Sequence, residues 1–213
     1  MKNRSLMASD ALKIRPAGEA DVHLLIEFIR CIAAYEKLLD EVVATEEGVR
    51  QSLFGEKSAA EALIGEWDGE PVAFAVYFEN FSTFMGRSGL YLEDLFVKLE
   101  YRKRGIGKLM LKHLAKIAME RGCSRFEWVA LNWNEPAIGF YKGLGAKQMS
   151  DWRLFRMSGE ALKQLAAEGS ARGLSSSLRA SGEMRRVESN ETDCPFHVFP
   201  AICPYHSSGS ATR

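Results

Sequence analysis

Residues 89–121 change from one hydrophobic period to another, and this change restricts the possible folds more than any other feature. Residues 89–97 (GLYLEDLFV) are typical of a strand, whereas apolar residues in 108–121 recur at helical spacing and form one stripe. A loop that contains two glycines, residues 101–107, separates the two patterns. A strand that leads through a short loop into an amphipathic helix favours a mixed α/β fold.

The other patterns agree with this fold class. We expect further strands at residues 11–15, 62–67, 72–81, 126–131 and 147–157, and further helices at 20–36, 45–54, 136–144 and 159–168. Thr45 is a suitable N-cap for the second helix, and the Asp68-Gly69 pair favours a tight hairpin between two strands. Strands dominate early and strand–helix–strand units late, which predicts one domain with a mixed sheet.

The two ends of the chain differ from this domain in composition. Residues 1–10 are expected to form a flexible leader, residues 11–168 the domain, and residues 169–213 a disordered, serine-rich tail. The tail contains the tetrads CPFH, from Cys194, and CPYH, from Cys203. Their spacing matches no standard zinc site, so we expect no bound metal.

Charge and hydropathy exclude several classes of protein. Lys plus Arg and Asp plus Glu both number 28, so the net charge is zero and a nucleic-acid partner is not expected. The longest apolar run, residues 72–78, is far shorter than the roughly 20 residues that span a membrane. No secretory signal follows Met1, and the four cysteines lie far apart. We therefore expect a cytoplasmic protein.

The loop before the 108–121 helix has the chemistry of an anion site. Its glycines permit close approach of a ligand, and the free N–H groups of the next helix favour a negative charge. The loop matches neither a P-loop nor a dinucleotide-binding fingerprint, and an ordinary turn with solvated basic residues remains an alternative. A pyrophosphate would suit the segment formed by Arg102, Lys103, Arg104, Gly105, Ile106, Gly107 and Lys108.

Several motifs in order resemble one family. R-x-x-G-I-G, YLEDLFV, WNEPAIGFYKGLGA, AAYEKL and DWRLFRM are similar to segments of the GNAT superfamily of N-acetyltransferases, in the branch of the spermidine/spermine (diamine) and thialysine acetyltransferases. The resemblance implies a twisted, splayed sheet with helices on both faces. It also implies direct transfer of acetyl from acetyl-CoA to a primary amine of a small cationic substrate, and a homodimer.

The resemblance also implies roles for individual residues. Tyr141 matches the tyrosine that donates a proton to the departing thiolate. Glu93 matches a carboxylate placed near the amine, which could accept the proton of the amine, directly or through water, or pair with its cation. Asp94 is expected on the opposite face of a regular strand. Acetyl-CoA would contact, besides the basic loop, the backbone of Leu95, Phe96 and Val97, and residues Asn134, Glu135, Pro136 and Ala137.

The implied acceptor site is acidic and aromatic. It comprises Tyr35, Glu36, Glu93, Glu127, Trp128, Val129 and Asp151. Ser82 and Phe84 stand where the polyamine enzyme carries an acidic residue and a tryptophan, which favours an amine with fewer charges. Diamines, polyamines and thialysine-like or lysine-like amino acids therefore remain open as acceptors. Two other functions also remain open: acetylation of a protein or peptide amine, and non-catalytic acetyl-CoA binding.

Overall fold

The computed structural model describes residues 11–168 of the 213-residue chain. It divides into two units, the first ending at Gln148 and the second beginning at Met149. The basic loop, residues 101–107, and the strand before it belong to the first unit.

A five-stranded sheet with the order β1-β2-β3-β4-β5 forms the centre of the first unit. The pairs β1·β2, β2·β3 and β3·β4 are antiparallel, whereas β4·β5 is parallel, which confirms the mixed sheet. The strands are β1 (Leu12–Pro16), β2 (Glu61–Trp67), β3 (Glu70–Ser82), β4 (Arg87–Val97) and β5 (Phe126–Trp128).

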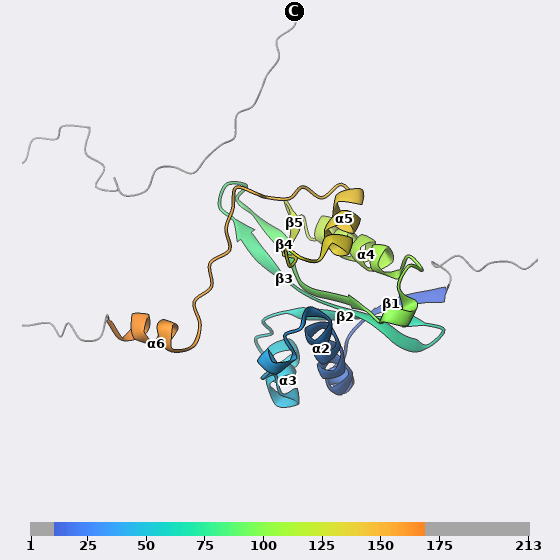
Figure 1. The fold of residues 1–213 in the computed structure, drawn as a ribbon, viewed down its shortest axis with the longest axis horizontal. Coiled ribbons are helices and arrows are strands. Elements are labelled where there is room, and N and C mark those ends of the chain that lie inside the picture. Colours follow the sequence, from blue (N-terminus) through green and yellow to red (C-terminus); the bar gives the residue numbers. More distant parts are fainter. Residues whose placement is uncertain (1–10, 169–213) are drawn as a thin grey trace, which may run out of the picture. The chain divides into compact units, whose positions relative to one another are not determined.

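Helices cover both faces of this sheet, as Figure 1 shows, with α2 and α3 on one side and α4 and α5 on the other. Three short 3₁₀ turns lie in the connections. The helices are α2 (Val22–Glu36), α3 (Glu46–Phe54), α4 (Ile106–Glu120) and α5 (Glu135–Gly143), and the turns are η1 (Glu19–Asp21), η2 (Leu39–Glu41) and η3 (Leu99–Tyr101). This arrangement confirms the predicted α/β class.

Each face of the sheet has its own hydrophobic core. On the α4 side, Met110 and Leu114 of the helix pack against Leu90 and Leu92 of β4. On the α2 side, Phe28 stacks on Phe74 with ring centroids 5.0 Å apart. Because alternate residues of a strand face opposite sides, one strand can supply both cores, and this fixes its register.

Local chemistry explains why the elements begin and turn where they do. The Thr45 hydroxyl accepts a hydrogen bond from the Gly48 N–H at 3.1 Å, which confirms the predicted N-cap of α3. Asp68 and Gly69 both have positive φ angles, 51° and 84°, between β2 and β3. Two positive φ angles in succession are typical of a type I′ hairpin turn, as the Asp-Gly pair predicts.

Two predicted boundaries and one predicted strand are wrong in ways that affect the site or the size of the sheet. Helix α4 begins at Ile106 and not at residue 108, because Gly105 adopts φ 84° and serves as its N-cap. Strand β5 ends at Trp128, three residues before the expected end. Residues 147–157, expected as a strand, contain none.

The second unit is described only through Glu168. It contains helix α6 (Gly159–Glu168), which confirms the last predicted helix. The predicted leader and serine-rich tail, with its two cysteine tetrads, lie outside the described residues. Within residues 11–168, no helix is long and apolar enough to cross a membrane.

The aromatic pair on the α2 side predicts a large loss of stability on truncation. Phe28 and Phe74 are both almost completely buried, so Phe28→Ala should lower the free energy of unfolding by about 3–5 kcal/mol, through lost burial and a cavity. Urea unfolding followed by circular dichroism measures this. Phe81→Ala, at a side chain that is 63% exposed, is the matched control and should change stability by less than about 0.5 kcal/mol. Equal losses in the two variants would contradict this account of the core.

Candidate active site

One extra residue in β4 shapes the site. Val76 of β3 pairs with Asp94, and the next residue, Tyr77, pairs with Leu92, so Glu93 has no partner on β3. Such a bulge changes the alternation of side chains. Leu92 and Leu95 both pack in the α4-side core although they are three positions apart.

The bulge places two carboxylates on the same face. Because Leu92 and Leu95 both face α4, Glu93 and Asp94 between them face the opposite, α2 side of the sheet. The expectation that Asp94 lies on the other face from Glu93 is therefore wrong, since it assumed a regular strand. Asp94 is a site residue that the sequence reasoning missed, and only the register of β3 against β4 reveals it.

Beyond the bulge, β4 and β5 part. The two strands pair only over Leu90–Leu92 and Phe126–Trp128, whereas β4 continues to Val97. The Lys98 N–H donates to the Val72 carbonyl on β3, so alternation directs the N–H groups of Leu95 and Val97 toward the opposite edge. Among residues 11–168 no strand pairs with that edge, which leaves two backbone donors for a ligand.

A second group of backbone donors lies at the start of α4. The first turn of a helix leaves N–H groups without intrahelical partners, and here it contains no acidic residue. Lys103 and Gly105 both have positive φ, 64° and 84°, so the loop doubles back just before the helix. A Cβ added at Gly107 would lie 3.8 Å from Phe140 and 3.9 Å from Val97, which places this turn against α5 and the end of β4.

The basic residues of the loop divide into two kinds. Arg102 donates from Nε to the Val97 carbonyl at 3.0 Å, and Arg104 donates to the Glu100 carbonyl at 3.2 Å. Lys103 and Lys108 are exposed and form no ion pair in the part of the chain that the structure describes. The two lysines, more than the two arginines, are free to bind an anion.

Three carboxylates influence one another on the α2 side of the sheet. Burial, and then the neighbouring charges of Glu93 and Glu36, raise the pKa of Asp94 to about 6. Burial also raises the pKa of Glu36, which lies in the last turn of α2. Negative charge held together in this way attracts a cation, because a bound cation offsets the repulsion among the carboxylates.

Tyr141 lies close to the same group. Its ring packs on Trp128 with centroids 5.1 Å apart, and the side chain is largely buried against the α4-side core. Burial, together with the charge of Glu36 and the nearby Tyr35, raises the pKa of the Tyr141 phenol. The phenol therefore keeps its proton at neutral pH and can donate it.

The other predicted site residues of the first unit have contacts of their own. Glu127 lies with its Oε2 2.7 Å from Arg125 Nε, and the same oxygen accepts from Asn80 Nδ2 at 3.1 Å. Trp128 supports Tyr141, and Val129 is exposed just after β5. Asn134 caps α5, in which Glu135, Pro136 and Ala137 form the first turn.

Asp151 belongs to the second unit, so its predicted role in the acceptor site stays a prediction.

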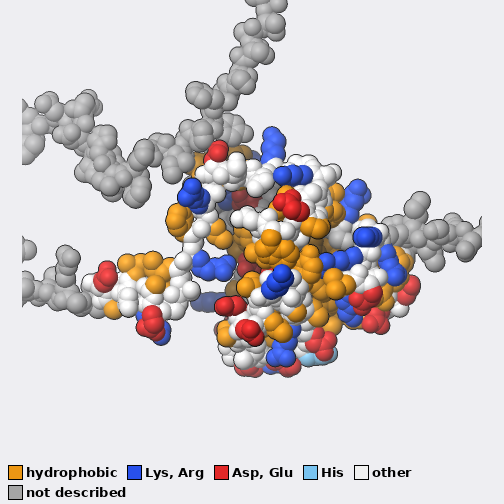
Figure 2. Space-filling view, in the orientation of Figure 1, with side chains coloured by type: hydrophobic (Ala, Val, Ile, Leu, Met, Phe, Trp, Pro, Cys, Tyr) orange, Lys and Arg blue, Asp and Glu red, His pale blue; other side chains and the backbone are white. Residues whose placement is uncertain are grey.

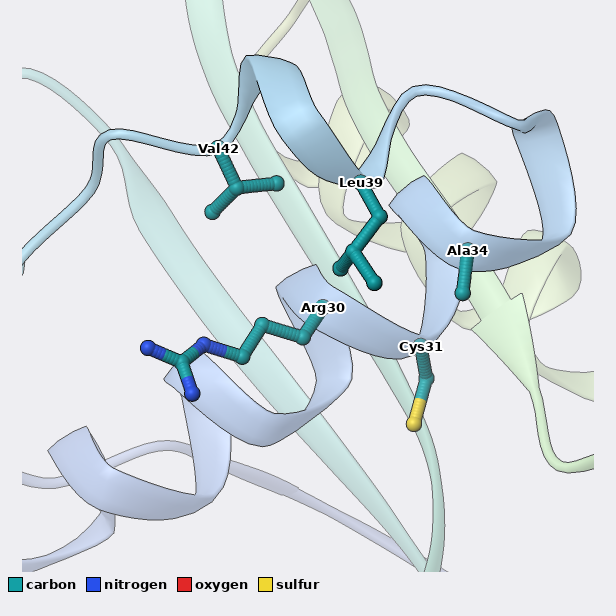
Figure 3. A pocket seen from close by; sticks show the side chains of 5 residues that line it. All are labelled: Arg30, Cys31, Ala34, Leu39 and Val42. Atoms are coloured by element: carbon teal, nitrogen blue, oxygen red, sulfur yellow. The ribbon is translucent and has the colours of Figure 1, made fainter.

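A separate hollow of about 430 Å³ lies on the outer side of α2 (Figure 3). Arg30, Cys31 and Ala34 line it from α2, and Leu39 and Val42 from the following turn. These three α2 residues are exposed, whereas Leu25 and Phe28 turn toward the sheet. The hollow therefore faces away from the carboxylates of β4. Figure 2 shows Lys and Arg interspersed with Asp and Glu around a hydrophobic strip that lies between the two helical layers.

Comparisons with known proteins agree on one family. The model of the acetyltransferase (GNAT) family matches residues 29–146. A thialysine N-epsilon-acetyltransferase from Sus scrofa is 40% identical over 166 residues, which cover 73% of this chain and 97% of that protein. An L-ornithine N5-acetyltransferase from Arabidopsis thaliana is 29% identical, over 72% of this chain and 87% of that protein.

A solved structure supports the fold. An integron cassette protein from the mobile metagenome of V. cholerae has a TM-score of 0.61 and 29% identity, covering 73% of this chain and 98% of that one.

The raised pKa of Asp94 predicts a pH-dependent cost to stability. Ionisation of Asp94 is harder in the folded chain than in the unfolded one, so stability should fall as pH rises from about 4 toward 6. Asp94→Asn should remove this fall and stabilise the protein at pH 7.5 by about 1–3 kcal/mol, with the difference vanishing near pH 4. Urea unfolding at several pH values tests this. Glu56→Gln, at an exposed carboxylate, is the control. A variant no more stable than the wild type at pH 7.5 would contradict the raised pKa of Asp94 and its origin in burial and the neighbouring carboxylates.

Proposed function

Because the chain belongs to the GNAT acetyltransferase family and is therefore an N-acetyltransferase, we propose that it transfers acetyl from acetyl-CoA to a primary amine of a small cationic substrate. One observation carries the choice of acceptor. Glu36, Glu93 and Asp94 form an acidic group on the α2 side of the splayed sheet, and Glu36 also acts on the pKa of Tyr141. A cationic amine bound by these carboxylates would therefore lie near the proton donor, Tyr141.

The residues at the splayed edge suit the cofactor. The N–H groups of Leu95 and Val97 would bind the acetyl and pantetheine portions, whereas the Phe96 side chain faces the α2-side core and offers only its backbone. The first turn of α4, with Lys103 and Lys108, would bind the pyrophosphate. Acetyl-CoA supplies an acetyl group activated as a thioester.

Proton transfer falls to two residues of this chain. An alkylamine is mostly protonated at neutral pH, and Glu93, which is exposed at the bulge, would accept its proton directly or through water. The Tyr141 phenol, protonated because its pKa is raised, would donate to the leaving sulfur. Direct attack by the amine, without an acyl-enzyme, agrees with the positions of the two described cysteines. Cys31 lies on the outer side of α2, and burial raises the pKa of the Cys123 thiol, which disfavours the nucleophilic thiolate.

The acidic group favours a short acceptor over a long polyamine. Ser82, where the polyamine enzyme carries an acid, is buried, and its hydroxyl accepts from the Met85 N–H at 3.3 Å to close the β3–β4 turn. Phe84 in the same turn is 74% exposed. Relatives named for thialysine and ornithine acetylation agree with an acceptor that has one distal charge.

We also propose a homodimer and a cytoplasmic location. The described cysteines, Cys31 and Cys123, are free thiols, which suits a reducing compartment. Exposed hydrophobic residues beside the site, Val129 and Trp133 among them, suit burial by a second copy. Light scattering after size-exclusion chromatography should give twice the monomer mass, and a monomer at micromolar concentration would overturn the dimer.

Removal of the phenolic hydroxyl tests the proton donor. Tyr141→Phe should lower kcat about 100-fold or more and leave the acetyl-CoA Kd nearly unchanged, because the ring still packs on Trp128. Turnover is measured by CoA-thiol release, and the Kd by calorimetry. Tyr77→Phe removes a hydroxyl that bonds Glu61 on β2 and should leave kcat within about twofold. Unchanged turnover in Tyr141→Phe would overturn the role of Tyr141.

An acceptor panel tests the substrate class. Thialysine, ornithine, lysine, diaminopropane, putrescine, spermidine, spermine and a lysine-containing peptide are compared by kcat/KM. We expect the short diamines and amino acids to exceed spermine by about tenfold or more, since one missing acid costs about 1–3 kcal/mol of recognition. Preference for the peptide would indicate a protein acetyltransferase. Acetyl-CoA binding without turnover on any amine would indicate a non-catalytic module.

A further inference from the structure

Tyr35, in the last turn of α2, makes one contact through the face of its ring and another through its hydroxyl. The Arg102 guanidinium carbon lies 4.3 Å from the centroid of the Tyr35 ring. The Tyr35 hydroxyl donates to Asn134 Oδ1 at 3.3 Å. Contacts of this kind, a cation over an aromatic face and a hydrogen bond at the phenol, fix the position of the ring.

These two contacts join three segments of the site. Arg102 belongs to the basic loop after β4, and its Nε also donates to the Val97 carbonyl at the open edge. Asn134 is almost fully buried and caps α5, the helix that carries Tyr141. Glu36 follows Tyr35 and is the last residue of α2. Tyr35 thus stands between the cofactor loop, an acceptor carboxylate and the proton donor's helix.

Besides the contacts of Tyr35 with Arg102 and Asn134, the aromatic and cation–π contacts at the end of α2 among the described residues are those with Trp133. Lys37 adopts the left-handed conformation, φ 62°, and closes the helix directly after Glu36. Trp133 lies beside it, with its ring 6.0 Å from Tyr35 and 5.9 Å from Lys37 Nζ, but it is half exposed. The Arg102 contact is therefore the one that ties this helix end to the loop.

We propose that Tyr35 and Arg102 are positioning residues that couple binding of CoA at the loop to the placement of Glu36 in the acceptor site. Arg102 is fixed by Val97 and Tyr35, and also lies 5.4 Å from the Phe96 ring, so protein contacts alone hold it. When a pyrophosphate orders the loop through Lys103 and Lys108, Arg102 passes that order to Tyr35. This inference rests on the proposed function, since it takes CoA to be the ligand of the loop.

Amide hydrogen exchange with CoA alone tests the coupling without any acceptor. In the wild type, saturating CoA should slow exchange in residues 32–38 by about fivefold or more, because ordering of the loop stabilises the end of α2. Arg102→Ala should lose this slowing. Arg102→Lys keeps the charge but loses the planar contact and the Nε donor, and should lose it as well.

The matched control is Lys103→Ala, which removes one positive charge from the same loop. It should weaken CoA binding, yet at saturating CoA it should still show slowed exchange in residues 32–38. Tyr35→Leu should behave as Arg102→Ala does, and the double variant should lose no more than either single one. In activity assays, Arg102→Lys should raise the KM for thialysine more than the Kd for acetyl-CoA.

The outcomes separate the coupling from the proposed function. If CoA binds and slows exchange at residues 32–38 equally in Arg102→Ala and the wild type, the coupling is overturned and the acetyltransferase function stands. If the wild type binds no CoA at millimolar concentration, both are overturned.

Discussion

The single unpaired residue at Glu93 is the constraint on which the rest of the site depends. Without it, Asp94 would lie with Leu92 in the α4-side core, where an unpaired carboxylate is strongly disfavoured. With it, two successive carboxylates face α2, and the strand then resumes with Leu95 and Val97 in the core. The same extra residue turns the N–H groups of Leu95 and Val97 toward the unpaired edge. One insertion therefore provides acidic side chains on one face and backbone donors at the edge.

The proposed site binds the cofactor and the acceptor with different kinds of group. The proposed cofactor side offers backbone N–H groups and two exposed lysines, which suit a long ligand with a pyrophosphate. The proposed acceptor side has three neighbouring carboxylates, and burial followed by the charges of the other two raises the pKa of Asp94, which suits a compact cation. Tyr141 lies where both meet, and its raised pKa follows from burial first and from Glu36 second. Repulsion among the three carboxylates destabilises the site when no cation is bound. A bound amine cation offsets this repulsion, so the repulsion favours amine binding.

Much of this could be predicted from the sequence, because the signals are local. The Asp68-Gly69 turn, the Thr45 cap and the change of period before α4 depend on neighbouring residues alone, and all three are confirmed. The bulge depends on how β4 aligns with β3, and no residue type marks it. Asp94 was therefore misplaced. The contact of Arg102 with Tyr35 was also missed, because it joins residues 67 positions apart and a charged residue in a basic loop suggests a phosphate first.

The contacts of Arg102 change how the basic loop is understood. Four cations near a helix N-terminus suggest that all four neutralise phosphate, yet two of them are bound to carbonyls of their own loop or strand. An arginine whose Nε donates to a strand carbonyl and whose guanidinium lies over a tyrosine is held by protein contacts rather than by the anion, so it can pass on the order that a bound anion gives to the loop. Binding then loses less conformational entropy at that side chain than at a free lysine. The loop thus combines two arginines that bind within the protein, one of which contacts the end of α2, with two exposed lysines that could bind the anion, and in the proposed coupling Glu36 takes its position through the first pair.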